Sequence, residues 1–193
     1  LPTITFLEST SMSTYLYQKR LYDLWQKSVQ LYGEGNRNHS TYFSDDEIGF
    51  LASLGIRSNE MYDYAEDFND HGEPDFTTFA LIHEVRRDYF LEVQNGETSD
   101  RIVSPQSLPA KDSELEGITW LPRIIAKAEG KLKGELDPDI MYSCPGDRRF
   151  LKHHDIHPAA FLRKVASSSA DRQAITDWVK KVTRATEPQE PHP

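Results

Sequence analysis

The side chains best suited to chemistry gather around the one cysteine of the chain, in the segment Cys144-Pro-Gly-Asp147-Arg148-Arg149. Proline at the first helical position and an acid in the first turn are typical of a helix start. A thiol placed there lies at the positive end of the helix dipole, which favours its thiolate form. The segment could therefore act as a nucleophile, or as an anion-binding helix start with Arg148 or Arg149 as a clamp.

The same segment also has a purely structural interpretation. Cys144 would pack as a small hydrophobic residue, Asp147 would cap the helix, and the arginines would pair with acids elsewhere in the chain. No His/Asn partner pattern of a cysteine hydrolase is visible, which argues against a nucleophile. The candidate contacts for an anionic ligand are five residues of this region: Tyr142, Cys144, Asp147, Arg148 and Arg149.

Two further groups of residues could do chemistry. His153, His154 and His157 follow Cys144 closely, and imidazole with thiolate suits zinc. His153 and His157 share a helix face only if the helix continues between them, whereas we expect it to stop there and His157 to cap the next one. No CxxC or HExxH pattern accompanies them, so we expect no metal and no cofactor.

The second group lies on an expected helix near 75–94 and comprises His83, Glu84, Arg86, Arg87 and Asp88. These residues could line a cleft between two halves of the chain and act as acid and base. Alternatively, Glu84 and Asp88 form surface ion pairs with the two arginines that are each worth little, which is the interpretation we favour.

The elements that must position these groups come in two similar sets, 100 positions apart. Apolar and small residues recur at helical spacing in both sets: Leu21, Leu24, Trp25, Ser28 and Tyr32, then Leu121, Ile124, Ile125, Ala128 and Leu132. A helix start follows each stripe; Ser44 and Glu47 form a capping box where the second set has Cys144. Both next helices should stop at a left-handed residue, which suits Gly55 better than Asp155.

The sequence therefore predicts an all-α fold of two pseudo-repeated four-helix units packed as a helical bundle. Helices are expected near residues 14–33, 45–54, 58–70, 75–94, 119–133, 145–154, 158–167 and 170–183. No segment shows a convincing strand pattern. The units are expected at 13–94 and 118–183, with a connector at 95–117 and a disordered tail at 184–193. We also expect the backbone of residues 20–65 to superpose on that of 120–165.

The totals exclude several classes of protein. Of 193 residues, 27% are charged and 37% hydrophobic, which is typical of a globular protein. No apolar run approaches the roughly 20 residues of a membrane span. We read no export signal, and the single cysteine suits a reducing compartment, so a cytoplasmic protein is expected. We expect Met12 to be the natural start, with the first eleven residues an extension.

Charge is distributed unevenly along the chain. The 31 acidic and 22 basic residues give a net charge of −9, which argues against nucleic acid as a partner. Acids concentrate in the first half, whereas Arg123 to Lys164 is mildly basic. The halves could dock on each other, within a chain or between chains, or these charges could simply be solvated.

We therefore predict a binding or interaction module that self-associates or binds a protein partner. The alternative is a small enzyme or ligand-binding protein acting on a carboxylate or phosphate compound through the Cys144–Arg149 helix start.

Residues 104 to about 182 resemble a bacterial family defined as domain of unknown function 5069. The features that carry the resemblance are Gly117, Leu121, Arg123, Lys127, Ala128, Gly134, Tyr142, Cys144, Pro145, Asp147, Arg149, Phe150 and Leu151. Ile156, Pro158, Phe161 and the Trp178-Val179 pair also fit. The chain differs where it carries His154 and Asp155, since the family pattern has an apolar residue before a glycine. The resemblance implies no reaction, substrate or cofactor, and the first half is expected to be a diverged copy of the same unit.

Overall fold

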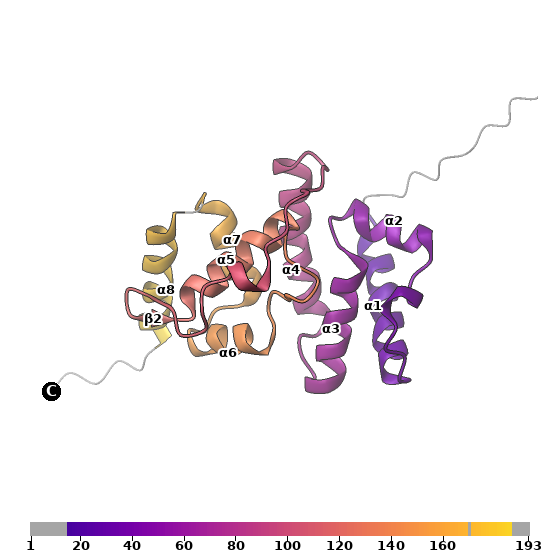
Figure 1. The fold of residues 1–193 in the computed structure, drawn as a ribbon, viewed down its shortest axis with the longest axis horizontal. Coiled ribbons are helices and arrows are strands. Elements are labelled where there is room, and N and C mark those ends of the chain that lie inside the picture. The colour runs from indigo at the N-terminus through magenta and orange to yellow at the C-terminus, as the bar shows by residue number, and fades with distance from the viewer. Residues whose placement is uncertain (1–14, 170, 187–193) are drawn as a thin grey trace, which may run out of the picture.

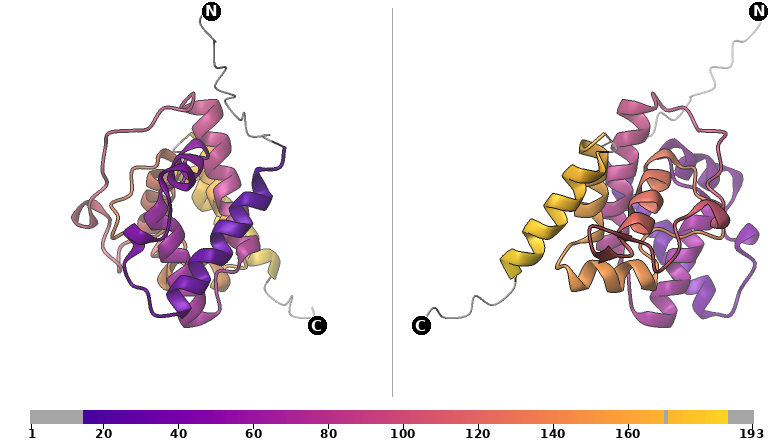
Figure 2. Two further views of the ribbon diagram at one scale, coloured as in Figure 1. Left: turned by 90° about the vertical axis from the view of Figure 1, so that its right-hand side faces the viewer. Right: turned by 60° about the vertical axis from the view of Figure 1, so that its left-hand side comes forward.

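The computed structural model describes residues 15–169 and 171–186. The predicted all-α class is confirmed, because helices make up most of these residues. In chain order they are α1 Tyr17–Gly33, α2 Asp45–Ser53, α3 Ser58–His71, α4 Phe76–Asp88, α5 Leu121–Lys133, α6 Pro145–His153, α7 Pro158–Ser167 and α8 Arg172–Thr186. The first helices lie at one end of the molecule and α8 at the other, where it extends away from its neighbours (Figures 1 and 2).

One pair of helices forms the centre of each half, and α4 lies between the two pairs (Figure 1). In the first half α1 packs against α3, and in the second α5 packs against α7. Helix α4 lies between the two pairs and packs against α7 and α5 (Figure 1). Buried apolar side chains from both halves, such as Met61 and Phe161, belong to one continuous cluster. The halves therefore share a single hydrophobic core.

The helix boundaries recur at positions 100 apart. Helices α2 and α6 cover equivalent residues, and α3 and α7 begin at equivalent positions. A left-handed residue follows α2 and α6, Gly55 with φ 70° and Asp155 with φ 52°. One residue later, the backbone N–H of Ile56 or Ile156 donates to a carbonyl of the preceding helix. These shared features favour the predicted repeat, and the superposition of 20–65 on 120–165 stays a prediction.

The connector contains a short antiparallel hairpin, although no segment of the sequence shows a convincing strand pattern. Strands β1 Glu114–Leu115 and β2 Ile118–Thr119 pair across Glu116 and Gly117, which both have positive φ, 50° and 80°. Two consecutive residues of positive φ make the tight turn that matches strand twist. Two-residue strands are too short to leave an alternating sequence pattern, which explains why they were missed.

Several helix ends differ from the predicted ones. Helix α5 begins at Leu121 rather than 119, because Trp120 adopts a left-handed backbone with φ 74°. Helix α4 ends at Asp88 and continues as a π-helical turn, Tyr89–Val93.

Residues 184–186, which were expected in the tail, belong to α8. Residues 1–14 and 187–193 lie outside the described residues, and so does the proposed start at Met12. Short 3₁₀ turns cover His39–Thr41 and Pro105–Ser107. No helix in the described ranges has the length and apolar character to cross a membrane.

Candidate functional site

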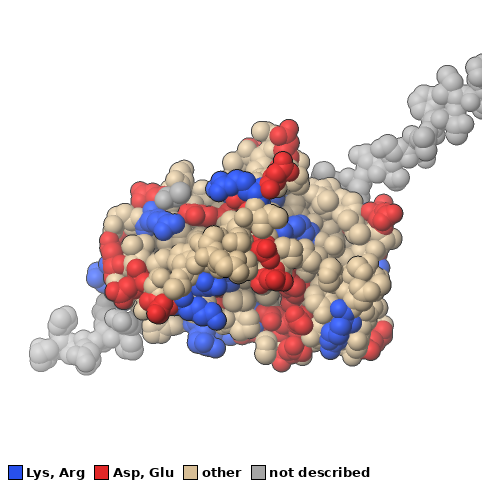
Figure 3. Space-filling view, in the orientation of Figure 1, with Lys and Arg blue, Asp and Glu red and all other residues tan. Residues whose placement is uncertain are grey.

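Opposite charges join the two halves within the chain. Four ion pairs of the described residues cross between them: Lys131 to Glu60 at 2.8 Å, Arg148 to Asp67 at 2.6 Å and to Glu73 at 3.4 Å, and Lys152 to Glu73 at 2.6 Å. Figure 3 shows acidic side chains gathered over the part of this face where α3 lies, beside basic ones over α6. Of the arrangements that the charge distribution allowed, docking within the chain is therefore the one adopted by these residues.

A cleft of about 750 Å³ lies between the halves, beside the start of α6. Acidic side chains of α3 line one wall: Asp63, Glu66 and Asp67. The other wall is basic and comes from the second half and the connector, with Lys111, Arg123, Lys127 and Arg149. Cys144 also lines the cleft and is partly exposed. The cleft thus brings Cys144 and Arg149, two of the five candidate contacts, together with acids of the first half.

A buried ion pair lies at the start of α6. The side chain of Lys127 is 4% exposed and that of Asp147 is 0% exposed, and the two form an ion pair. The Lys127 ammonium also lies 3.2 Å from the sulfur of Cys144. Asp147 accepts further hydrogen bonds from the Trp120 indole and the Ser143 backbone N–H, each at 3.0 Å. The prediction that Asp147 caps the helix was therefore wrong, since it bonds the residue before the cap and anchors Lys127.

Tyr142 and Arg148 were predicted as ligand contacts and are instead used within the protein. The Tyr142 hydroxyl donates to the carbonyl of Pro158 at 2.8 Å, and burial raises the pKa of this tyrosine well above its usual value. Arg148 is 5% exposed and donates to Asp67 and to the carbonyl of Ser143, the latter at 2.7 Å. Both side chains hold neighbouring segments together and neither lines the cleft.

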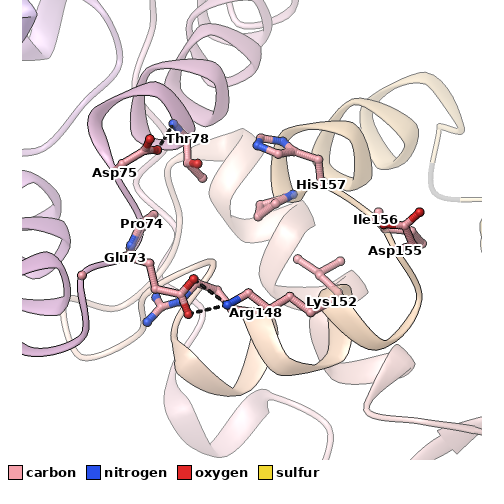
Figure 4. A pocket seen from close by; sticks show the side chains of 12 residues that line it. Glu73, Pro74, Asp75, Thr78, Arg148, Lys152, Asp155, Ile156 and His157 are labelled. Carbon is pink, nitrogen blue, oxygen red and sulfur yellow. Dashed lines mark hydrogen bonds and ion pairs between the residues drawn. The ribbon is translucent and has the colours of Figure 1, made fainter.

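Arg148 lines a second hollow of about 500 Å³, where Glu73 pairs with Arg148 and Lys152 (Figure 4). Its other polar groups serve as helix caps. Asp75 accepts from the backbone N–H of Thr78 at the start of α4. His157 accepts from that of Ala159 at the start of α7, which confirms its predicted capping role. Glu73 thus joins the two halves at this hollow through Arg148 and Lys152.

Several cationic side chains of the cleft beside Cys144 form few bonds within the protein. Arg149 and Lys111 are exposed, and Arg123 donates from one nitrogen to the carbonyl of Pro109 at 2.7 Å. Within residues 15–169 and 171–186, none of these three cations forms an ion pair. An anion entering the cleft would therefore meet three cations that are in no ion pair with a described residue, opposite the acidic wall of α3.

The acidic wall includes one carboxyl group with unusual titration. Burial raises the pKa of Asp63 to about 7, and the neighbouring carboxylates of Glu60 and Glu66 add to the effect. Glu66 accepts from the Tyr32 hydroxyl at 2.9 Å, while Asp67 is paired with Arg148. Sequence reasoning missed Asp63, although acids three and four positions apart share a helix face. It also missed Lys127, whose 20-residue spacing to Asp147 repeats that of the Lys27–Glu47 pair.

The histidines and the polar residues of α4 lie elsewhere. His154 is buried, stacks near Phe150 with ring centroids 4.5 Å apart, and its Nδ1 lies 2.8 Å from the Thr183 hydroxyl. In the described part of the chain, no three His, Cys, Asp or Glu side chains are placed to hold a metal ion. On α4 the expectation of surface pairs was wrong for Arg86, which is buried, whereas Arg87 lies 3.7 Å from Glu84; His83 is buried as well.

The family model described as Domain of unknown function (DUF5069) matches residues 105–192 of the chain. The matched region contains the basic wall of the cleft and Cys144, whereas the acidic wall on α3 lies outside it. Searches of the curated proteins and of the solved structures each found no match.

Proposed function

We propose that the chain is a ligand-binding protein that holds a small carboxylate or phosphate compound in the cleft beside Cys144. The observation that carries the proposal is the basic wall, where Lys111, Arg123 and Arg149 form no ion pair with any described residue. Like charges on one wall repel each other, and a bound anion offsets that repulsion through charge-assisted hydrogen bonds.

The start of α6 adds to this wall. Cys144 is its N-cap and makes no capping hydrogen bond from the side chain, so the first turn keeps unsatisfied N–H groups. Gly146 lines the cleft in this turn, and a Cβ there would lie 2.7 Å from the ring of Trp120. Glycine therefore lets Trp120 cover the buried Asp147 while the backbone at 146 stays accessible to a ligand.

The same cleft supports chemistry on the ligand. Asp63, with a pKa of about 7, can hold or release a proton near neutral pH, which is what a general acid or base requires. Across the cleft, the partly exposed Cys144 sulfur lies 3.2 Å from the Lys127 ammonium, so a nucleophilic side chain and a proton donor are side by side. A small enzyme acting on the bound anion is therefore the extension of this proposal.

A second candidate is an interaction module that binds a protein partner or its own copy. The specific observation is apolar exposure around the connector, with Ile102 68% and Val93 58% exposed. The charge asymmetry supports this candidate less than the sequence alone suggested, because acids and bases of the two halves already pair within the chain.

Calorimetric titration with inorganic phosphate and with acetate tests the ligand-binding proposal. Arg149→Ala should weaken the affinity about tenfold, since one charged hydrogen bond is worth roughly 1.5–3 kcal/mol, and should leave the melting temperature unchanged. Lys181→Ala is the matched control, because it removes the same charge from an exposed position on α8. Because Cys144 is the chain's one thiol, iodoacetamide labelling offers a second readout, and a bound anion should slow it.

Two results would contradict the proposal. One is that neither phosphate nor acetate binds or protects Cys144 from alkylation. The other is that Arg149→Ala and Arg123→Ala both bind the probes as tightly as the unchanged protein. If light scattering then gave a dimer mass that Ile102→Ser reduced to a monomer, the interaction module would be the better description.

A further inference from the structure

A third hollow, of about 520 Å³, lies where the turn between α2 and α3 meets the end of α5 and residues 98–102 of the connector. Four cationic residues line it: Arg57, Arg86, Arg101 and Lys133. Asp100 is the one acidic residue that lines it within the described parts of the chain. Its apolar lining includes Ile48 and Ile102, which are 41% and 68% exposed. We refer to this hollow as the Arg86 groove.

Arg86 is a buried cation without a carboxylate partner in the described residues. The residue is only 2% exposed, and burial lowers the pKa of its guanidinium to about 10. Nη1 donates to the carbonyl of Leu132 at 2.8 Å and to the Gln94 amide oxygen at 2.6 Å. Nε is buried and has no hydrogen-bond partner. Gly134 leaves room for this group, since a Cβ there would lie 2.8 Å from Nη2.

The charges around Arg86 do not balance. Glu60 accepts from Lys131 at 2.8 Å and lies 3.8 Å from Arg57, so one carboxylate serves two cations. His83 adds no charge near neutral pH, because burial lowers its pKa to about 3. The carbonyl end of α5 offsets part of the Arg86 charge through Leu132. Arg86 itself remains a buried cation that forms no ion pair with a described residue, and burying an unpaired charge is costly unless an anion is added.

We propose that the Arg86 groove binds an organic carboxylate with an apolar body, the carboxylate facing Arg86 and Arg57 and the body lying against Ile48 and Ile102. A guanidinium can donate charge-assisted hydrogen bonds to such a carboxylate, and Arg86 lines the groove without an ion-pair partner among the described residues. The exposed isoleucines would be shielded from water by an alkyl or aryl chain. This site is separate from the cleft beside Cys144 and does not rest on the function proposed for that cleft.

Titration calorimetry with octanoate and with acetate tests the site. Octanoate should bind the unchanged protein at least tenfold more tightly than acetate, and Ile102→Ser should weaken octanoate binding several-fold with no effect on acetate. Arg86→Gln should weaken octanoate binding at least tenfold; it keeps a donor for the carbonyl of Leu132, and circular dichroism checks its folding. Arg149→Ala, at the other cleft, should leave octanoate binding unchanged.

The proposal is overturned if octanoate binds no more tightly than acetate, or if Ile102→Ser and Arg86→Gln both leave its affinity unaltered. Loss of octanoate binding in Arg149→Ala alone would assign the ligand to the other cleft and would also overturn it. Because Ile102 is largely exposed, its variant should fold, so a failure of Arg86→Gln to fold still leaves a decisive measurement.

Discussion

The carboxyl group of Asp63 lies on α3 between Glu60 and Glu66, and its titration depends on both burial and these neighbours. Its pKa is about 7 in the folded chain, against an ordinary value of 3.8. The folded state therefore binds a proton more readily than the unfolded state between these two values. The group favours folding below about pH 4, and that contribution is lost as the pH rises through 7.

Asp63→Asn should therefore increase the free energy of unfolding at pH 8 by about 1–3 kcal/mol, since each unit of pKa corresponds to about 1.4 kcal/mol. The gain should shrink as the pH is lowered to 5, because Asp63 is then protonated in the folded protein. Urea denaturation at both pH values measures it. Asp139→Asn removes the same charge from an exposed residue of the cleft and should change stability little at either pH. An equal effect of Asp63→Asn at both pH values would show that its ionisation is not the cause.

At the scale of elements, the starts of α2 and α6 are stabilised by different interactions at equivalent positions. In α2 a capping box forms at Ser44, and Lys27 pairs with Glu47 while 40% exposed. In α6 the lysine and acid at the equivalent positions are almost fully buried. The difference follows from Trp120, which lies 100 positions after Arg20 and covers the pair. A capping signal in the sequence thus locates a helix start, but it does not reveal what covers that start.

The ends of the same two helices give a matched pair of variants. Asp155→Gly should stabilise the protein by about 0.5–1 kcal/mol, because glycine adopts the left-handed backbone at φ 52° without strain. Gly55→Asp should destabilise it by more than that amount. Its φ is 70°, and a Cβ at this position would lie 2.9 Å from the Phe90 ring. Thermal denaturation measures both, and a loss of stability in Asp155→Gly would mean that its side chain has a role beyond the turn.

At the scale of the whole molecule, complementary charge holds the halves together. Residues 13–94 carry 15 acidic and 7 basic residues, a net charge of −8. Residues 118–183 carry 8 acidic and 12 basic residues, a net charge of +4. Arg148 connects them most directly, since it is buried and bonded to Asp67 of the first half. Opposite net charge attracts the halves, while the shared apolar core and a few buried pairs fix how they fit.

Arg148→Met should cost about 3 kcal/mol or more of unfolding free energy, because it leaves the partly buried Asp67 without its cation. Lys152→Ala is the matched comparison. It removes an ion pair between the same halves, but the lysine is 66% exposed, so the loss should stay below about 1 kcal/mol. Urea denaturation compares the two variants. Similar losses in both would indicate that the apolar core, rather than the buried pair, sets how the halves dock.

The sequence by itself determined the all-α class and most helix boundaries. The capping box at Ser44, the stop at Gly55 and the cap at His157 are all present in the structure. These features follow from interactions between residues a few positions apart, so their signal is local and readable in the sequence. The sequence also placed Cys144 at a helix start, for the same reason.

Only the tertiary structure decided which charges remain available to a ligand. Arg148 and Arg149 are adjacent in the chain, yet one is bonded to Asp67, 81 positions away, and the other is exposed in the cleft. Tyr142, Asp147 and Arg86 were likewise assigned by their burial against distant elements. The cost of burying a charged group, and the partner that offsets it, depend on which helix faces it across the core. Helical periodicity cannot supply that information, because it describes one helix at a time.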